Sequence, residues 1–389
     1  MKIAYIIQSL SFKGGTERVL TEKMNYMSEH YGYDIYVITC NQPPSETNCY
    51  YLSNKITQIN LDIRNYSVYK YRYPERLWKK WAIHSIFKKK IAETINHINP
   101  DIIIGVGHYK ANCICKLYRN AKIIIECHDG RLITSLLTQK TKRSIISKLY
   151  MPFYRWIYFR TIEHYADTIV TLTDGAKEKW RKAKNVVVIP NFTSMSVLRY
   201  STCNTKRIIS VGRLRWEKGF DRLIDIWKCV SYKYPSWKLD IFGEGEQKEQ
   251  LTNRIHSENI PNIYIHDNTS NISYEYADSS ICLITSYFEG FSLVLLEAMK
   301  HGLPCIAFDC PFGPGSIIQN GINGYLIKEG NNTDYINKLC DLIENISLRK
   351  QLSKAAIERA KFFDTDKIME QWRFLFESIV NTNNSHKSK

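Results

Sequence analysis

The sequence predicts an α/β protein made of two doubly wound units that face a cleft. The chain has 389 residues, which favours two domains over one. Short apolar runs alternate with helix-like segments, as expected for parallel strands that are buried on both faces. This alternation stops in a stretch rich in Ser, Thr and Asn and then begins again, which indicates a second unit of the same kind.

The first half of the chain contains six runs that are predicted to be buried parallel strands. They are KIAYII (2–7), DIYVITC (34–40), DIIIGVG (101–107), KIIIEC (122–127), DTIVTLT (167–173) and NVVVIP (185–190). Helical patterns lie between them, such as TERVLTEKMNYMSEHY over 16–31. A repeated strand–helix–strand pattern predicts a doubly wound sheet.

The second half repeats this pattern after a polar stretch. Its predicted strands are KRIISVG (206–212), KLDIFG (238–243), NIYIHD (262–267), ICLITS (281–286), PCIAFD (304–309) and GYLIK (324–328). We therefore predict a first domain over 1–195, a linker over 196–205 and a second domain over 206–363. An amphipathic terminal helix is expected over 364–380, followed by a disordered tail over 381–389.

Composition narrows the possible partners and the compartment. Lys and Arg number 54 against 38 Asp and Glu, a formal charge of +16, which requires an anionic partner or surface. The eleven cysteines form no Cys-x-x-Cys pair, so reduced and mostly buried thiols in the cytosol are expected. No predominantly apolar stretch of about 18 residues is free of charge, and the first apolar run is too short for a signal peptide.

The segment FEGFSLVLLEAMKHG, over 288–302, carries two carboxylates with seven uncharged residues between them. Ser292 is an N-cap candidate, so LVLLEAMK is predicted to be a helix that ends at Gly302. Glu289 then lies in the loop before this helix, and Glu297 lies inside the helix. An ordinary loop and helix with two surface glutamates is the alternative.

The N–H groups at the start of that helix form a candidate anion site. A carboxylate would repel a phosphate, so the two glutamates suit neutral hydroxyl groups while the backbone suits the phosphate. A ligand that offers both groups is a nucleotide sugar. The candidate binding residues here are Gly290, Phe291, Ser292, Leu293 and Glu297, beside Glu289.

Cations that could balance a diphosphate occur in SVGRLRWEKGFDRLI, over 210–224. Arg213 follows a predicted strand directly, and Lys218 precedes a predicted helix. An arginine fork and a lysine charge can hold a diphosphate and stabilise it as it leaves. A solvated loop with basic residues is the alternative.

Three further candidates lie at predicted strand ends. Gly243 and Glu244 follow one strand, where they are expected under the base or the ribose, although a plain turn fits almost as well. Gly14 and Gly15 lie between the first strand and the first helix, where backbone N–H groups could approach a ligand, unless they only form a tight turn. His128 follows the strand KIIIEC and could bind a sugar hydroxyl group, although a lone histidine is usually structural.

These segments resemble the retaining glycosyltransferases of family 4, which have the GT-B fold. The similarity is carried by SVGRLRWEKG, FGEGEQKEQL and EGFSLVLLEAMKHGLPCIAFD, and by GGTERVL, ECHDG and IPN in the first half. It implies an acceptor-binding domain, a nucleotide-sugar-binding domain and a C-terminal helix that returns to the first domain. Phe192 is a departure, because the family often has proline there.

The resemblance also implies the reaction. A hexose from a UDP-sugar is expected to pass, with retention of configuration, to a glycan acceptor, itself lipid-linked, in the biosynthesis of capsule, O-antigen or exopolysaccharide. The implied contacts are Arg213 and Lys218 with the diphosphate, Glu289 with sugar hydroxyl groups, Glu297 with the ribose, Gly15 near the phosphates and His128 near the transferred sugar.

The implied mechanism needs no carboxylate nucleophile of the glycosidase kind. The leaving phosphate oxygen is expected to accept the proton of the acceptor, while the glutamates supply orientation. No cofactor is expected beyond the donor, and no metal. The pair Asp364 and Asp366 has the spacing of a manganese motif, but it opens the last predicted helix and is better explained by N-capping.

The basic residues gather with aromatic residues in two segments, over 64–90 and over 131–160. The first includes Tyr66, Tyr69, Tyr73, Trp78 and Trp81, and the second includes SKLYMPFYRWIYFR. This composition is typical of a surface that binds anionic membranes. We therefore expect a peripheral protein on the cytoplasmic face of the cell membrane. Nucleic acid is not an expected partner, since no recognition motif accompanies the charge.

Two other functions remain open from the sequence. A nucleotide-sugar epimerase of related fold would release a sugar without needing an acceptor. An inactive partner subunit would bind the nucleotide sugar only. The presence of Arg213, Lys218, Glu289 and Glu297 favours an active enzyme.

Overall fold

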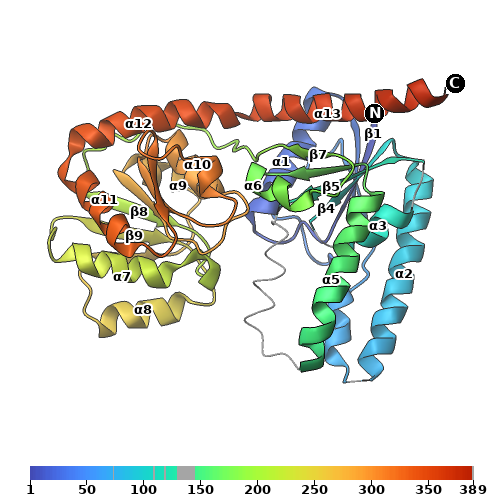
Figure 1. Ribbon diagram of the computed structural model, residues 1–389, viewed down its shortest axis with the longest axis horizontal. Helices are drawn as coiled ribbons and strands as arrows, with labels where there is room; N and C mark the ends of the chain where they lie inside the picture. The colour runs from blue at the N-terminus through green and yellow to red at the C-terminus, as the bar shows by residue number, and fades with distance from the viewer. Residues whose placement is uncertain (73, 108–109, 118–119, 129–144, 388–389) are drawn as a thin grey trace. The chain divides into compact units, whose positions relative to one another are not determined.

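The computed structural model describes residues 1–72, 74–107, 110–117, 120–128 and 145–387. It contains two compact units, drawn in Figure 1. Unit 1 comprises Met1–Ile189 and Ile368–Lys389, and unit 2 comprises Pro190–Lys367. The stretch 196–205, expected to be a linker, therefore belongs to unit 2. Ser201 and Cys203 in it are buried, and the Ser201 N–H donates to the His301 carbonyl.

Unit 1 is built on a seven-stranded sheet in the order β3-β2-β1-β4-β5-β6-β7. All of its strand pairs are parallel. The strands are β1 (Lys2–Ile7), β2 (Asp34–Thr39), β3 (Thr57–Asn60), β4 (Ile102–Val106), β5 (Lys122–Cys127), β6 (Thr168–Thr171) and β7 (Val186–Val188). Each predicted strand is present, and β3 was missed because its sequence, TQIN, has no apolar run.

The helices of unit 1 cover this sheet. They are α1 (Gly15–His30), η1 (Asn65–Lys70), α2 (Glu75–Ile98), α3 (Ala111–Leu117), α5 (Ile145–Tyr165), α6 (Asp174–Lys177), η2 (Glu178–Trp180) and α13 (Thr365–Lys387), of which η1 and η2 are 3₁₀ helices. Phe87 and Ile91 of α2 pack with Ile103 of β4 in one core. Phe159 of α5 packs with Ile125 of β5 in a second core.

Helix α13 is longer than the sequence predicts. It continues to Lys387, through residues that were expected to be disordered beyond 380. The extra residues include Asn, Thr and Ser, which are weak helix formers, but no Gly or Pro, so nothing in the sequence forces the helix to end. Asp364 has an extended backbone directly before α13, the conformation of an N-cap residue.

Unit 2 is built on a six-stranded parallel sheet in the order β10-β9-β8-β11-β12-β13. The strands are β8 (Arg207–Val211), β9 (Lys238–Phe242), β10 (Ile263–His266), β11 (Ile281–Ile284), β12 (Cys305–Asp309) and β13 (Gly324–Lys328). All six were predicted. The chain reverses the direction in which it adds strands between β8 and β11, so this is the switch point of the sheet.

The helices of unit 2 complete its core. They are η3 (Trp216–Lys218), α7 (Phe220–Ser231), α8 (Lys248–Ser257), α9 (Ile272–Ala277), α10 (Leu293–Lys300), η4 (Pro314–Ser316), α11 (Asn332–Glu344), α12 (Ile346–Ala360) and η5 (Lys361–Phe363). Trp227 of α7 and Tyr335 of α11 are completely buried in the core with Leu283 of β11.

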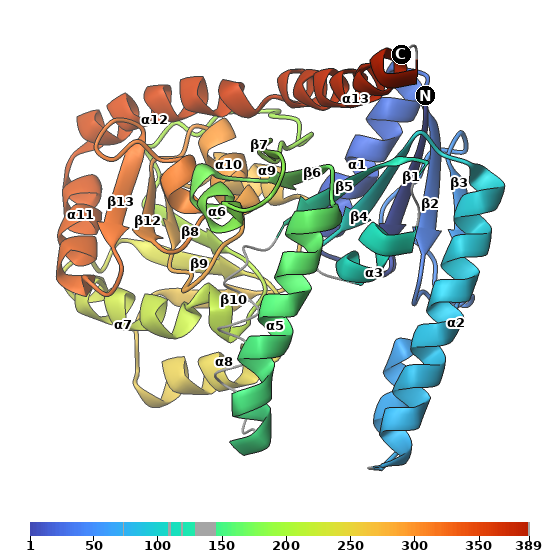
Figure 2. The same ribbon diagram turned by 45° about the vertical axis from the view of Figure 1, so that its right-hand side comes forward.

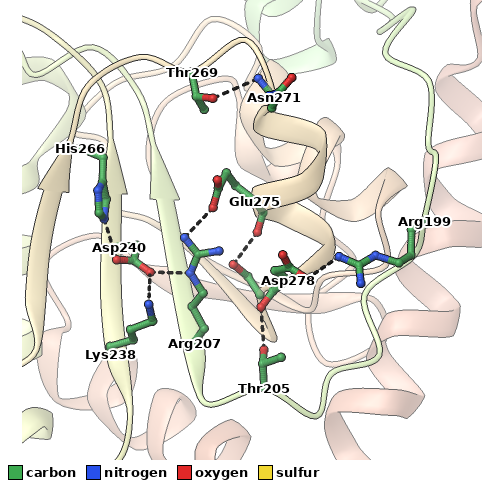
Figure 3. A network of polar contacts seen from close by, with 11 residues as sticks. Arg199, Thr205, Arg207, Lys238, Asp240, His266, Thr269, Asn271, Glu275 and Asp278 are labelled. Carbon is green, nitrogen blue, oxygen red and sulfur yellow. Dashed lines mark hydrogen bonds and ion pairs between the residues drawn. The ribbon is translucent and has the colours of Figure 1, made fainter.

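A network of polar side chains ties three strands of unit 2 together (Figure 3). The buried Asp240 carboxylate accepts from Arg207 and from His266, the latter at 2.7 Å, and Lys238 lies 3.3 Å from it. Burial would raise the pKa of Asp240, but hydrogen bonds from Arg207 and His266 outweigh it and lower the pKa. Arg207 also pairs with Glu275 of α9 at 2.6 Å, so the network holds this helix to the sheet.

Candidate active site

Two of the loops singled out from the sequence meet at the switch point of unit 2. One connects β8 to α7 and contains Arg213 and Lys218, and the other connects β11 to α10 and contains Glu289. Because β8 and β11 are neighbouring parallel strands, both loops leave the same edge of the sheet. Ligands of doubly wound sheets bind at this position.

Lys218 and Glu289 form an ion pair across these loops. The Lys218 ammonium lies 2.7 Å from Oε1 of Glu289, and the Ser286 hydroxyl donates to the same oxygen at 2.7 Å. The Glu289 side chain is only 9% exposed, and that of Lys218 is 25% exposed. The carboxylate that would repel a phosphate is therefore covered by a cation that would attract one.

Gly219 allows the two loops to approach this closely. Its φ is +64°, a conformation that favours glycine, and a Cβ atom here would lie 2.0 Å from the Thr285 carbonyl oxygen. The Thr285 hydroxyl donates to the Gly219 carbonyl at 2.9 Å, and the Tyr287 N–H donates to the Glu217 carbonyl at 2.9 Å. The β8–α7 and β11–α10 loops are thus bonded to each other before any ligand arrives.

Arg222 clamps the second loop, a role that sequence reasoning missed. Its buried guanidinium donates to the Thr285 and Ser286 carbonyls and pairs with Glu329, each at 2.5 Å. It also lies 4.1 Å from the centre of the Tyr287 ring. Arg222 follows Lys218 by four residues in the same basic segment, but its partners are distant in the sequence, so the segment alone gives no sign of this role.

Gly243 and Glu244 form a third loop at the same edge. The Leu214 N–H donates to the Glu244 carbonyl at 2.8 Å, and a Cβ atom at Gly243 would lie 1.9 Å from the Gly212 carbonyl oxygen. The absence of a side chain at Gly243 therefore allows the two loops to approach each other closely, while the Glu244 side chain is exposed. Arg213 is also exposed, two residues after the end of β8.

The start of α10 has the expected form, with one difference. Ser292 occupies the N-cap position with an extended backbone, but its hydroxyl makes no capping bond. This hydroxyl is buried and has no hydrogen-bond partner in the part of the chain that the structure describes. Gly290 and Phe291 lead into the helix, and Phe291 packs against Phe363 with ring centres 5.7 Å apart. Leu293 is the first helical residue.

Glu297 lies inside α10, as predicted. It is buried, and the Tyr276 hydroxyl of α9 donates to its Oε2 at 3.4 Å. Glu289 therefore lies in the loop before α10 and Glu297 lies within α10, so different elements hold the two carboxylates.

The candidate residues of unit 1 lie at strand ends of its own sheet. Gly14 is the N-cap of α1, with an extended backbone, and Gly15 is the first residue of that helix. His128 directly follows β5 and is buried. Its Nε2 lies 3.0 Å from Oε1 of Glu126.

A buried ion pair that sequence reasoning missed adjoins His128. Lys23 of α1 lies 2.5 Å from both carboxylate oxygens of Glu126, the last but one residue of β5. Burial would raise the pKa of Glu126, but Lys23 and His128 outweigh it and lower the pKa to about 2. A single acid in the apolar run KIIIEC was the available signal, and its partner in α1 could not be identified from it.

Within the described ranges, no group of three or more His, Cys, Asp or Glu side chains is arranged to hold a metal ion. The polar groups at the unit 2 switch point are instead one ion pair, backbone N–H groups at the start of a helix and a buried serine hydroxyl. This combination suits an anion flanked by hydroxyl groups.

Comparison with known proteins gives two family matches that together cover most of the chain. Residues 13–196 match the family described as Glycosyltransferase Family 4, and residues 202–359 match the family described as Glycosyl transferases group 1. Unit 1 and unit 2 each contain most of one match.

The chain is also similar to individual proteins over nearly its whole length. It is 30% identical over 383 residues to an uncharacterized glycosyltransferase of Haemophilus influenzae, covering 96% of this chain and 99% of the relative. It is 29% identical over 386 residues to the amylovoran biosynthesis glycosyltransferase AmsD of Erwinia amylovora, covering 95% and 98%. The crystal structure of HepE from Anabaena in complex with UDP and glucose shares the fold, with a TM-score of 0.70 at 17% identity, covering 97% and 100%.

Proposed function

Because this chain belongs to the family 4 glycosyltransferases of GT-B fold, we propose that it acts in polysaccharide biosynthesis, as its relative AmsD does, and transfers a hexose from a UDP-sugar to a glycan acceptor with retention of configuration. The observation that carries this proposal is the Lys218–Glu289 pair at the switch point of unit 2. HepE, which shares the fold, is crystallised with UDP and glucose, and this supports a UDP donor.

Each polar group of the site has a role in this proposal. The donor diphosphate lies against Lys218 and Arg213 and receives the N–H groups at the start of α10. Glu289, held by Ser286, turns its remaining acceptor positions to hydroxyl groups of the sugar. Glu297 accepts from the ribose, while Gly243 and Glu244 lie under the nucleoside. Lys218 separates the phosphates from the Glu289 carboxylate, which removes their mutual repulsion.

Charge stabilisation at the leaving group is the main catalytic contribution in this mechanism. The bond from the anomeric carbon to the diphosphate oxygen breaks, and the acceptor oxygen bonds to the same face of the sugar. The acceptor proton passes to the leaving phosphate oxygen. Arg213 and Lys218 stabilise the negative charge that develops there. Glu289 has no nucleophilic role in this mechanism; Lys218 and Ser286 hold its Oε1, which fixes the orientation of the carboxylate.

A panel of nucleotide sugars tests the donor. We expect a UDP-hexose to raise the thermal unfolding temperature of the purified chain and to be hydrolysed slowly, more than GDP- or ADP-sugars do. Nuclear magnetic resonance of the first-formed product should show the donor's anomeric configuration. A product of inverted configuration would contradict the retaining mechanism, and free epimerised sugar would indicate an epimerase.

Arg213 has a matched control in the same loop. Arg213→Ala should lower kcat/KM by about 10²-fold or more, since it removes a cation from the developing charge. Arg215→Ala removes the same charge two residues away, where the side chain is exposed and lies 3.9 Å from Glu217. Equal losses in the two variants would mean that Arg213 contributes only to the general charge of the loop.

A basic and aromatic surface of unit 1 supports a lipid-linked acceptor and attachment to a membrane. Trp78 and Trp81 of α2 are 72% and 68% exposed, and Phe153 and Trp156 of α5 are 59% and 57% exposed. Both helices follow strands of a parallel sheet, so they begin at the carboxyl edge of the sheet, and Figure 2 shows their first turns projecting beyond the strands. Exposed Trp and Phe beside lysines are typical of interfacial surfaces.

This surface includes only part of the two segments that suggested it. Tyr73 and residues 129–144 lie outside the described residues. None of the helices in the described part of the chain has the length and the apolar character that a bilayer crossing requires. The attachment proposed here is therefore built on Trp78, Trp81 and the exposed residues of α5.

Vesicle flotation tests the membrane proposal. The full chain should float with vesicles that contain anionic lipid at low salt, and a Trp78→Ser/Trp81→Ser variant should float several-fold less. A Tyr232→Ser/Phe374→Ser variant is the control, because those rings are 63% and 73% exposed at positions outside α2 and α5. Absence of flotation in the wild type, or equal loss in both variants, would rule out the proposed surface.

A further inference from the structure

The ion pair of Lys23 and Glu126 is an unusual component for the interior of a domain. Their side chains are 1% and 2% exposed, so both charges have lost their water. Replacing such a pair with apolar residues is often neutral or even stabilising, because desolvation offsets the attraction. Stability alone therefore does not account for the pair, and its surroundings indicate what else it does.

Glu126 determines which nitrogen of His128 carries a proton. As an ionised carboxylate it can only accept, so the Nε2 atom at 3.0 Å must donate to it. In the neutral imidazole the other nitrogen, Nδ1, is then an acceptor. Nδ1 is buried and has no hydrogen-bond partner among the residues that the structure describes. An unsatisfied buried polar atom is destabilising, so a ligand group that donates to it is expected.

We infer that Lys23 and Glu126 are positioning residues for His128, which they hold in the Nε2–H form so that Nδ1 accepts a hydrogen bond from a hydroxyl group of a sugar bound at unit 1. This inference rests on the proposed function, because it takes the ligand of His128 from it. The carboxylate orients the ring, as in other sites where a second residue fixes a histidine tautomer. Lys23 balances the charge that Glu126 would otherwise place beside the imidazole.

Aromatic side chains complete the enclosure of Lys23. Its ammonium lies 3.9 Å from the centre of the Trp372 ring on α13 and 5.4 Å from that of Tyr5 on β1. These rings replace water around the cation. Burial and Glu126 raise the pKa of Tyr5, so its hydroxyl stays protonated and adds no charge. Among the described residues, Glu126 thus has Lys23, His128 and the Tyr5 hydroxyl as titratable neighbours.

Two single variants should shift the pH dependence of activity in opposite directions. Lys23→Met leaves the Glu126 charge unbalanced, which favours the protonated imidazole, so the limb of the kcat/KM profile that depends on His128 should move to higher pH. Glu126→Gln removes the carboxylate, so the same limb should move to lower pH. An opposite charge at this range shifts a titration by about one unit or more. The double variant Lys23→Met/Glu126→Gln should lie between the two.

A merely structural role predicts a different result. Loss of folded protein lowers the height of the profile, whereas the position of its limb stays unchanged. Limbs that coincide in both single variants and the wild type would overturn the inference. The His128→Asn variant identifies the limb, because only the limb that depends on His128 disappears with it.

A spectroscopic test separates this inference from the proposed function. With ¹⁵N-labelled histidine, the ligand-free wild type should show His128 as the Nε2–H tautomer, assigned with His128→Asn, and Lys23→Met/Glu126→Leu, which removes the acceptor, should lose this preference. This readout needs no turnover. A chain that fails to use any nucleotide sugar but shows the tautomer refutes the function alone, whereas an Nδ1–H tautomer in the wild type refutes the positioning role.

Discussion

Gly219→Ala tests whether the two loops of unit 2 must touch for the site to exist. The Cβ atom would lie 2.0 Å from the Thr285 carbonyl oxygen, where real Cβ atoms stay beyond 3.0 Å, so the loops must separate by about 1 Å. The left-handed φ of +64° adds about 1–2 kcal/mol for any residue other than glycine. Two hydrogen bonds that join the loops, from Thr285 and Tyr287, contribute roughly 1 kcal/mol each.

We therefore expect Gly219→Ala to lower the free energy of unfolding by about 3–4 kcal/mol, which is roughly 10 °C in the melting temperature of a domain of this size. Gly330→Ala is the matched control, because its φ is +80° while nothing lies within 4 Å of the added Cβ atom. It should lose only the conformational term, about 1–2 kcal/mol. Thermal unfolding of both variants, with and without UDP, measures the difference.

The binding readout is more specific than stability. Separating the loops moves Lys218 away from Glu289, so the rise in melting temperature with UDP should disappear in Gly219→Ala and persist in Gly330→Ala. If both variants have the same melting temperature and UDP raises it in both, the site does not depend on the close contact of the two loops.

Three other perturbations have definite expected results. Arg222→Lys cannot donate to both the Thr285 and Ser286 carbonyls, so it should lower the free energy of unfolding by about 2–3 kcal/mol in thermal melts, whereas the more exposed Arg254→Lys should cost less than half of that. The pKa of Glu126 is held near 2 in the folded chain. The ionised carboxylate therefore contributes its full stabilisation at pH values above the ordinary pKa of a glutamate, and this stabilisation is lost as pH falls towards 2. The free energy of unfolding should therefore fall less steeply between about pH 4 and 2 in Lys23→Met/Glu126→Leu than in the wild type. Equal slopes in the two proteins would contradict the low pKa of Glu126. In native protein, N-ethylmaleimide should modify the exposed Cys49 and Cys229 first and the partly exposed Cys340 later, as mass spectrometry can follow, and early modification of Cys282 or Cys305 would contradict their burial.

Apolar runs were sufficient to find nearly all of the sheet, because strands that are buried on both faces cannot be polar. Every predicted strand from β1 to β13 is present, and the polar β3 was the one left out. Its residues are only partly buried or exposed, so packing does not demand an apolar sequence there. The turn signals at Ser292 and Gly302 also located both ends of α10.

Partners that are distant in the sequence could not be found in this way. Lys23 and Glu126 are separated by 103 residues, and Arg222 and Glu329 by 107. Nothing in the local pattern of α1 marks Lys23 as buried, since a lysine in an amphipathic helix normally faces water. The contact between Lys218 and Glu289 was foreseeable only in outline, from the rule that neighbouring strand ends share an edge.

Unit 1 is assembled from two segments that are far apart in the chain, and this affects how the protein is made. Its first part ends at Ile189 and its last begins at Ile368, so about 180 residues are translated between them. At about 5–20 residues per second, the ribosome needs roughly 10–40 s for this stretch. During that time Lys23 lacks the Trp372 ring, and the surface that receives Phe376 beside Tyr33 stays uncovered. Unit 1 begins to be made before unit 2 but is completed after it. A nascent chain that stops before α13 therefore exposes an apolar surface that chaperones can recognise.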